Sequence, residues 1–426
     1  MKEEFIQIKN FIKENYKLNR APVCNDINFF TEKIKKKLPN GQIIKGLSGE
    51  ECFTWTIPEA WNVKKATLKD SKGNTIIDFK NNPLHLIQYS DSFTGELTFE
   101  ELEKHLYFSK ESPDDIPFIY RKQYYFKKEY SWGIALPFNV FKSLSRDEKF
   151  VVDIDVEFKK MDMYIFDYLL PGESSETIFL AAHSCHPAQV NDGIAGIGIL
   201  IELFKWLEKL EKRKYTYRMI IGPEYYAAAL FLKKAEKIKD LKFGFFLDMM
   251  VHDGTMGMSS SFEKDTIVDF VSEACLKKTF PKFKKYDYRG LWGNDEMFYD
   301  GPDFKIPTIG LGRSDFKNYH LSSDNMDTVK EKSVLESIEL LKTIILAFEG
   351  ERTIKRNYKG PLYLNRYGLY IDPKINPKGY QDLQKIQYYM DGKKSTLEIA
   401  KKFGIDPFFV NEFALELINK KLANEI

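Results

Sequence analysis

The sequence predicts an α/β protein whose central sheet is covered by helices on both faces, together with a small β-rich unit and a helical C-terminal unit. Residues 151–350 alternate continuous apolar runs with helical runs, which is typical of strands buried within such a sheet. Residues 50–150 are dense in aromatic and β-branched side chains, and residues 360–426 are helical in pattern. A length of 426 residues favours two or three domains over one.

The N-terminal residues, up to about position 45, are helical in pattern. The stretch MKEEFIQIKNFIKENYKLNR predicts an amphipathic helix, and it lacks the apolar core of a signal peptide. No apolar run approaches the ~20 residues that a transmembrane helix needs. The four cysteines are widely spaced, with no CxxC pair, which suits a reducing compartment. We therefore expect a cytoplasmic protein with no membrane partner.

Residues 50–150 predict a small β-rich unit. Short alternating runs are bounded by Asn, Asp, Gly, Ser and Pro, as strands joined by turns require. The runs include CFTWTIPEAW, KDSKGNTII, KNNPLHLIQYSDSFTG and KEYSWGIALPF.

Residues 151–350 predict the central sheet and its helices. Strands are expected at 163–170, 177–183, 217–222, 242–250 and 307–312. Helices are expected at 193–210, 225–238, 264–278 and 331–349. The glycines that open the first of these helices, Gly193, Gly196 and Gly198, do not form the dinucleotide-binding fingerprint and indicate close helix packing instead.

Residues 360–426 predict three helices, of which the last two have the look of a helix-turn-helix pair. Lysines in this tail are mixed with acidic residues, and no arginine follows Arg366. A DNA-reading helix presents a denser basic face, and the whole chain is balanced at 64 basic and 62 acidic residues. We therefore favour protein contacts, such as formation of a homo-oligomer, as the role of this unit over nucleic-acid binding, which its helix-turn-helix pattern leaves open.

Side chains able to bind a metal follow the predicted strands one after another. They are His183, His186 and Asp192 after strand 177–183, Glu224 after 217–222, Asp248, His252 and Asp253 around the end of 242–250, and Asp295, Glu296 and His320 in later loops. Ligands of α/β sheets bind beyond the carboxyl ends of the strands, so we expect these groups to meet there. Imidazole nitrogen combined with carboxylate oxygen is the ligand set of hydrolytic zinc sites.

Such a ligand set suits a hydrolase that uses no covalent nucleophile. Zinc lowers the pKa of a bound water, and two ions ~3.5–4 Å apart can share this task. A bridging carboxylate holds such a pair together, and a separate carboxylate moves the proton. Asp192, directly before Gly193 at the start of a predicted helix, is a natural candidate for the bridging residue.

Each residue also has a simpler structural interpretation when it is taken alone. Asp192 could cap the following helix, Glu224 could lie at the favourable end of a helix dipole, and His252 could be a hydrogen-bonded structural residue. Asp248 is different, because an aspartate within FLDMM is costly to bury without a partner. Five strand ends in succession favour a shared site over these separate interpretations.

Cys185 offers a competing chemistry, since a thiolate activated by a histidine is a nucleophile. His183 and His186 flank it in the sequence. Near sequence neighbours rarely approach a sulfur with the required geometry, so we expect Cys185 to take no part in the reaction.

Three stretches resemble the core of M28-type zinc aminopeptidases: HSCHPAQVNDGIAGIGILIELFKWL, DYRGLWGNDEMFYDGPDFKIPTIGLGR and YHLSSDNMDTV. The chain is most similar to a bacterial aminopeptidase-like subgroup, formerly of unknown function. This resemblance implies a phosphorylase/hydrolase-like, doubly wound mixed sheet in a peptidase domain made of residues 1–49 and 151–355. It also implies an inserted β domain at 50–150 and a winged-helix domain at 360–426.

The resemblance further implies metal ligands. Asp192 matches the bridging aspartate, Asp248 the aspartate of the second site and His320 the closing histidine. The histidine of the first strand matches either His183 or His186, and we favour His186 because it stands clear of the strand.

The acidic motif departs from the pattern, because many M28 enzymes carry two adjacent glutamates, a base and a ligand, where this chain has GPEYY. Either one metal site is then weak or Glu296 supplies the missing carboxylate, and we predict Glu224 as the base. We predict substrate contacts from Asp295, Tyr319 and Trp132.

The sequence thus predicts a hydrolase with one or two zinc ions, an aminopeptidase or a related amidohydrolase acting on small peptide-like substrates. Aromatic residues of the β-rich unit either limit access to the site or, as we favour for most, form the core of that unit: Trp55, Tyr120, Tyr124, Tyr125 and Trp132. The alternative is a metal-binding sensor or scaffold that signals through the C-terminal helices. Carboxypeptidase or deacetylase chemistry on a related fold is a third hypothesis.

Overall fold

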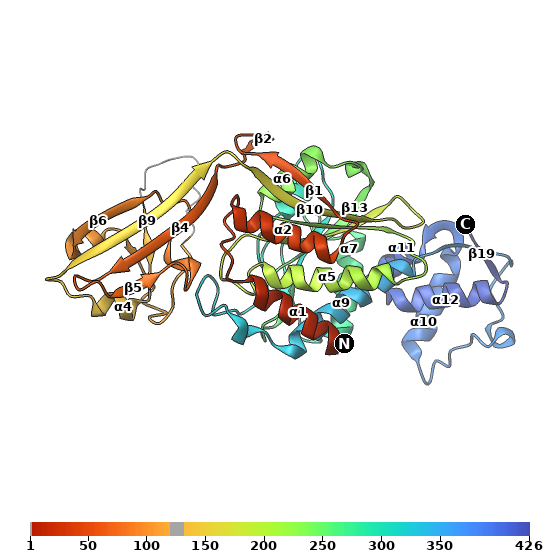
Figure 1. The fold of residues 1–426 in the computed structure, drawn as a ribbon. Coiled ribbons are helices and arrows are strands. Elements are labelled where there is room, and N and C mark those ends of the chain that lie inside the picture. The colour runs from red at the N-terminus through yellow and green to blue at the C-terminus, as the bar shows by residue number, and fades with distance from the viewer. Residues whose placement is uncertain (1, 120–131) are drawn as a thin grey trace.

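The computed structural model describes residues 2–119 and 132–426, and its centre is an eight-stranded mixed sheet (Figure 1). Across the sheet the strands are β1 (Gln42–Leu47), β10 (Asp162–Leu170), β12 (Thr216–Gly222), β11 (Thr177–His183), β13 (Leu241–Leu247), β16 (Thr308–Arg313), β14 (Met256–Ser259) and β15 (Lys284–Tyr286). The four central strands β12, β11, β13 and β16 are parallel, whereas β10 and β14 pair antiparallel to them. The five predicted strands are confirmed, whereas the edge strands β1 and β15, and β14 next to β15, were not predicted.

Helices cover both faces of the sheet, as the apolar strands predicted. One face carries α1 (Lys2–Asn15), α2 (Asn25–Lys37), α5 (Ile194–Glu208), α7 (Ile267–Thr279) and α9 (Glu331–Glu349), and the other carries α6 (Tyr226–Lys234) and α8 (Glu296–Tyr299). Short 3-10 turns lie at η3 (Ile238–Asp240) and η4 (Met326–Thr328). Every residue of β11 is buried, because helices pack on it from both sides.

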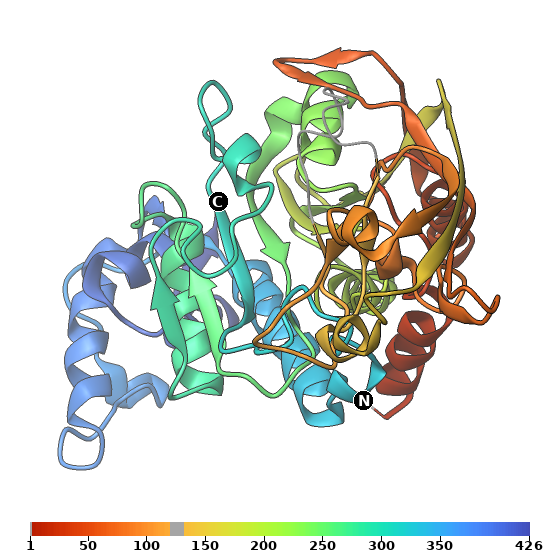
Figure 2. The ribbon, with the colours of Figure 1, turned by 90° about the vertical axis from the view of Figure 1, so that its left-hand side faces the viewer.

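The β-rich region forms a second sheet with the order β5-β4-β9-β6, at the left of Figure 1 and facing the viewer in Figure 2. Its elements are β4 (Ala60–Lys69), β5 (Thr75–Asp78), η1 (Pro83–His85), β6 (Phe93–Thr98), α3 (Phe99–Glu103), α4 (Phe138–Ser143) and β9 (Lys149–Lys159). Two-stranded pairs join β2 (Glu51–Cys52) to β3 (Trp55–Thr56) and β7 (Leu106–Tyr107) to β8 (Ile134–Ala135). Strand β9 continues past residue 150, and the division into an inserted domain stays a prediction.

The C-terminal residues form a third unit with its own apolar core. It contains β17 (Thr353–Arg356), η5 (Leu364–Tyr367), α10 (Pro377–Ile386), η6 (Gln387–Tyr389), β18 (Asp391–Ser395), α11 (Thr396–Phe403), α12 (Pro407–Asn419) and β19 (Ala423–Glu425). Ser395 caps α11 in a capping box with Glu398, which fixes where this helix begins. The three strands form one small sheet that the sequence analysis missed, and the winged-helix assignment stays a prediction.

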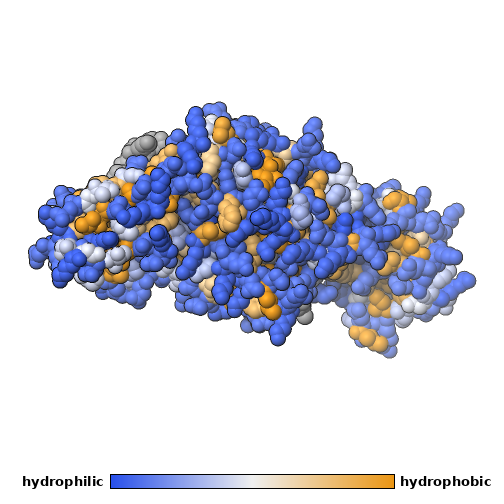
Figure 3. Space-filling view, viewed as in Figure 1, coloured by the Kyte–Doolittle hydropathy of each residue, from blue (hydrophilic) through white to orange (hydrophobic). Residues whose placement is uncertain are grey.

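The face of the molecule in Figure 3 is mainly hydrophilic, with small and scattered apolar patches. Among residues 2–119 and 132–426, no helix combines the length and the apolar character needed to cross a bilayer.

Candidate metal centre

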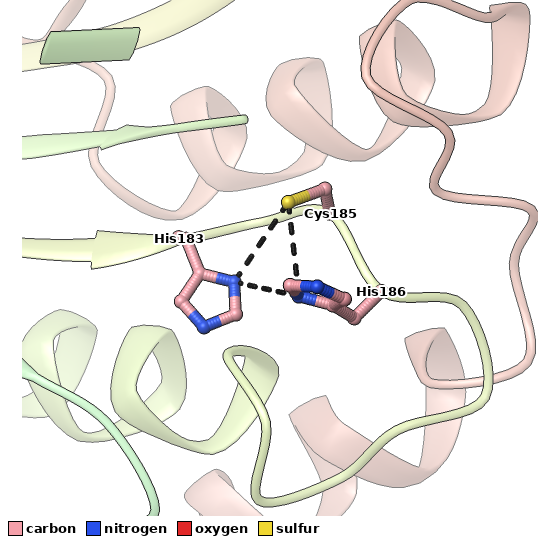
Figure 4. Close-up of side chains that lie close together, drawn as sticks. All are labelled: His183, Cys185 and His186. Carbon is pink, nitrogen blue, oxygen red and sulfur yellow. Dashed lines mark hydrogen bonds between the residues drawn. The ribbon is translucent and has the colours of Figure 1, made fainter. Parts of the chain in front are cut away.

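The loop that follows β11 brings His183, Cys185 and His186 together (Figure 4). The Nδ1 atoms of the two histidines lie 3.2 Å apart, and the sulfur of Cys185 lies 3.9 Å from that of His183 and 3.8 Å from that of His186. His186 and Ala188 have φ values of 75° and 52°, so the chain turns back sharply after the strand. Such backbone strain is kept only where the surrounding structure enforces it.

Asp192 lies at the centre of the site, between histidines from two loops. Its Oδ1 is 3.2 Å from Nε2 of His183 and 3.5 Å from Nδ1 of His186, whereas its Oδ2 is 3.0 Å from Nε2 of His320. The N-cap of α5 is Gly193, which has no side chain to form a cap, so the interpretation of Asp192 as a helix cap is wrong. Gly193 is required here: its φ is 104°, and a Cβ would meet the carbonyl oxygen of His183 at 2.6 Å.

The side chains form two donor sets that share Asp192. The outer donor set is His186, Asp192 and His320, and the inner donor set is His183, Asp192 and Asp248; within each set the donor atoms lie within 4.8 Å of one another. The inner set is almost fully buried, whereas the side chain of His320 is 26% exposed and opens the outer set to solvent. The structure thus brings together all five predicted metal ligands, and His183 and His186 fall into different sets.

These donor atoms fit a bound cation better than they fit one another. Nε2 of His183, Oδ2 of Asp192 and Nε2 of His320 are buried, and in the described part of the chain none of them makes a hydrogen bond. They lie within ion-pair distance of their neighbours but without hydrogen-bond directions. Buried polar groups are almost always paired, so atoms that converge without bonding indicate a missing partner. Imidazole and carboxylate donors suit zinc.

An excess of buried carboxyl groups also indicates a bound cation. Burial raises the pKa of Glu224 and of Asp248, and it raises that of Asp295 to about 8 and that of Glu296 to about 7. Neighbouring carboxylates raise these pKa values further, since Asp192 and Asp248 act on Glu224 and Glu224 acts on Asp295. A divalent cation would supply the compensating charge.

The surroundings shift the pKa values of His186 and His183 in opposite directions. Burial lowers the pKa of His186 to about 3, so its imidazole is neutral, which is the form that binds a metal. Burial opposes protonation of His183 as well, but the carboxylates of Asp248 and Asp192 raise its pKa well above the usual value. A metal ion in the inner donor set would therefore replace a proton.

A cavity of about 240 Å³ opens over the outer donor set. It is lined by His186, Asp192, Glu224, Tyr225, Asp248, Trp292, Gly293, Asn294, Tyr319 and His320. Oε2 of Glu224 lies 3.8 Å from Nε2 of His186. The ring of Tyr319 stacks on His320 at 3.9 Å and on Trp292 at 5.2 Å, which forms an aromatic wall beside the carboxylates. Glu224 and Tyr319 therefore line the cavity, as the roles predicted for them require.

Other predicted residues lie away from this cavity. Asp295 and Glu296 are buried outside its wall, where they accept hydrogen bonds from the backbone N–H groups of Tyr225 and Asn294. Trp132 is buried in the core of the β-rich region, stacked on His105 and Phe93, so it does not contact the cavity.

Trp55 and His252, two further candidates from the sequence, contact other parts of the protein. Trp55 packs on Tyr225, at 5.5 Å between ring centroids, whereas Tyr120, Tyr124 and Tyr125 lie outside the described residues. Both ring nitrogens of His252 bond to backbone groups, so His252 is structural.

Cys185 approaches both histidines, so the expectation that sequence neighbours would not reach the sulfur is wrong in its geometry. Burial nevertheless raises the pKa of its thiol, and the backbone N–H of Glu224 donates to its sulfur at 3.3 Å. Cys185 does not line the cavity. A protonated thiol without access to substrate is not a nucleophile.

Two supporting residues were missed in the sequence. Asp324 is fully buried and accepts hydrogen bonds from the backbone N–H groups of Asn191 and Asp192, which fixes the turn before α5. The amide nitrogen of Asn294 donates to Oδ2 of Asp248 at 3.1 Å and orients that carboxylate. Asp324 lies in the motif YHLSSDN and Asn294 in WGNDE, but nothing in the sequence indicated where their side chains point.

Arg20, just after α1, is a third residue that the sequence analysis missed. Its guanidinium is fully buried, and burial lowers its pKa to about 10. It donates to the carbonyl oxygens of Ser184, His186 and Gln189 at 2.5–3.0 Å, and to two carbonyl oxygens at the end of α1. One side chain therefore bonds to three carbonyl groups of the loop after His183, which carries His186.

Replacing Arg20 by lysine should lower the free energy of unfolding by about 3 kcal/mol, because an ammonium cannot reproduce the planar fork and leaves buried carbonyl groups unpaired. Urea denaturation measures this change. The matched control is Lys13→Met on the exposed side of α1, which should change stability little. Equal stability of the Arg20→Lys protein would show that the loop does not depend on the guanidinium.

The chain matches a known protein family and a protein of Clostridium acetobutylicum. The family described as “Domain of unknown function (DUF4910)” matches residues 9–351. A protein of Clostridium acetobutylicum, provisionally named for polysaccharide biosynthesis and for an aminopeptidase-like domain, is 30% identical over 94% of this chain and 92% of its own length.

Solved structures agree in fold. The crystal structure of a provisionally named peptidase from Clostridium acetobutylicum has a TM-score of 0.89 and 28% identity, and the match covers 100% of this chain and 97% of that one. A zinc aminopeptidase from Bacillus subtilis has a TM-score of 0.57 and 11% identity over 82% of this chain and 94% of its own. The resemblance to zinc aminopeptidases is thus confirmed at the level of the fold.

Proposed function

From the premise that the chain belongs to the family described as “Domain of unknown function (DUF4910)”, we propose that it is a zinc-dependent hydrolase of peptide-like amide bonds, and specifically an aminopeptidase. One observation carries this proposal: two sets of metal donors share Asp192 at the mouth of a small cavity. Pairs of metal ions joined by a carboxylate are typical of hydrolytic centres that use no covalent nucleophile.

His186 accounts for the missing second glutamate of the GPEYY motif. With Asp192 and His320 it completes a set of three donors, so Glu224 is not needed as a ligand. Glu224 belongs to neither donor set, yet it lines the same cavity. A single glutamate therefore suffices, because the ligand role has passed to a histidine.

Bound zinc would polarise the scissile carbonyl group and lower the pKa of a water molecule. Glu224 then accepts the proton of the attacking water and returns it to the leaving amine, which is the work of a general base and acid. Burial raises the pKa of Glu224 above its usual value, which makes its carboxylate a stronger base than an exposed one.

The cavity limits the substrate to a small group. Its volume of about 240 Å³ suits one residue of a peptide-like compound. Carboxylates in its lining favour a protonated amino group, and Trp292 and Tyr319 offer an aromatic wall to the rest of that residue. This combination supports cleavage next to a free amino terminus.

The proposal is tested by metal content and hydrolysis together. The purified protein should hold up to two zinc equivalents and hydrolyse members of a panel of aminoacyl amides, and dialysis against a chelator should abolish that hydrolysis. The His186→Ala and His320→Ala proteins should each lose one equivalent and at least about 100-fold in kcat/KM, since each removes a ligand. If the zinc content and the activity are unchanged in both variants, the proposal is wrong.

The panel should also include an N-acetylated amino sugar, because the name of the Clostridium acetobutylicum relative mentions polysaccharide biosynthesis. Cleavage of that compound in preference to aminoacyl amides would transfer the assignment to deacetylase chemistry on the same centre.

A further inference from the structure

The loop that carries His320 is paired with a segment of the β-rich region, residues 115–118. The backbone N–H of Phe118 donates to the carbonyl oxygen of His320 at 2.8 Å, and the N–H of Ser322 donates to the carbonyl oxygen of Ile116 at 2.9 Å. Pro117 and Leu321 lie opposite each other as an antiparallel bridge. The two segments, some two hundred residues apart in the chain, thus form a short ribbon beside the metal centre.

Side chains reinforce this ribbon. The hydroxyl of Ser322 accepts a hydrogen bond from the N–H of Ile116 and donates to Oδ1 of Asp115, each at 3.0 Å. His320 itself has a φ of 57°, a conformation that non-glycine residues adopt only when the surroundings enforce it. The ribbon supplies that constraint, because it fixes the backbone on both sides of the bridge.

The ring of Phe118 contacts both histidines of the outer donor set. Its centroid lies 5.0 Å from that of His186 and 5.0 Å from that of His320, with interplanar angles of 89° and 80°. Edge-to-face pairs at this distance are favourable and directional. No corresponding ring contact with Phe118 is found for His183, the histidine of the inner donor set, within the described residues.

Phe118 is held in an apolar cluster. Phe118 is buried with Ile116, Leu84 and Ala135 of the β-rich region and with Ala188, two residues after His186. The ring therefore spans the two loops that supply the outer histidines and ties both of them to the β-rich region. A side chain in this position fixes the separation and the tilt of the two imidazoles.

We propose that Phe118 is a positioning residue that determines metal occupancy of the outer donor set, so the β-rich region completes the metal centre. This inference rests on the proposed metal-dependent function. Outer-shell partners of metal ligands set the orientation of those ligands, and their loss typically costs 10–100-fold in metal affinity. The inner donor set lacks this contact and keeps its affinity when Phe118 is changed.

The test compares metal stoichiometry in Phe118→Ala, Phe118→Tyr and wild-type protein. After equilibration with limiting free zinc, Phe118→Ala should retain one equivalent where the wild type retains two, and Phe118→Tyr, which keeps the ring, should retain two. With cobalt in place of zinc, titration should show the second equivalent binding at least about tenfold more weakly in Phe118→Ala, with a changed visible absorption spectrum.

The matched control is Phe99→Ala, which removes a buried ring from the core of the same region, packed on Phe141 and Phe150. It should lower stability without changing the number of zinc equivalents. Loss of metal in Phe99→Ala to the same extent would overturn the inference, since any destabilisation of the β-rich region would then suffice.

A milder variant guards against misfolding of Phe118→Ala. Ser322→Ala removes two hydrogen bonds of the ribbon and leaves every ring in place, and it should weaken the second equivalent in the same direction. Two tightly bound equivalents in both Phe118→Ala and Ser322→Ala would overturn the inference. Wild-type protein that binds no zinc would instead contradict the proposed function.

Discussion

Replacing Asp192 by asparagine should remove both metal ions and lower kcat/KM by roughly three orders of magnitude or more. The side chain keeps its size, but a neutral amide cannot face His183 with one oxygen and His320 with the other. Asp192 belongs to both donor sets, so its replacement should affect both ions, whereas replacement of any other ligand should affect only one. Metal ions supply several kcal/mol of transition-state stabilisation, and each 1.4 kcal/mol is about tenfold in rate.

Elemental analysis of the purified Asp192→Asn protein measures the zinc content, and kcat/KM on the best aminoacyl amide measures the chemistry. The control is Asp253→Asn, an exposed aspartate on the loop after Asp248 that belongs to neither donor set. It should retain the full metal content and activity. Retention of two tightly bound ions in Asp192→Asn would rule out a bridging role.

Replacing Glu224 by glutamine should give the opposite combination, with full metal content and little activity. Glutamine is nearly isosteric and preserves the cavity, but it cannot accept the proton of the attacking water. A positioned general base contributes typically 10²–10⁴-fold, so kcat/KM should fall by about that factor with zinc content unchanged. Loss of a zinc equivalent would identify Glu224 as a ligand.

Glu296→Gln is the informative comparison, because Glu296 was the alternative carboxylate. It lies outside the cavity wall, so the change should leave kcat largely intact. A larger loss of kcat in Glu296→Gln than in Glu224→Gln would move the base role to Glu296. Glu263→Gln, at an exposed position, controls for the loss of charge alone.

The predicted strands and helices of the central sheet emerge from periodicity and burial, which are local properties. The stretch TIFLAAH becomes β11 with the predicted bounds, and residues 331–349 become α9 with the predicted bounds. Strands β14, β15 and β17–β19 have between three and five residues each, and segments that short carry too little pattern to be distinguished from loops.

The sequence by itself determined that histidines and carboxylates would gather at one edge of the sheet. That followed because β11 and β13 are parallel neighbours, so His183 and Asp248 leave the sheet at the same edge. The metal-binding residue types and their order along the chain were sufficient for this step.

Only the tertiary structure decided how the site is divided. The placing of His183 and His186 in different donor sets depends on the sharp turn after β11, whose carbonyl groups accept hydrogen bonds from Arg20. The placing of His320 depended on a ribbon formed with the β-rich region. Contacts between segments this far apart leave no periodic trace in the sequence, because they form between side chains and backbone groups that meet only after the chain has folded.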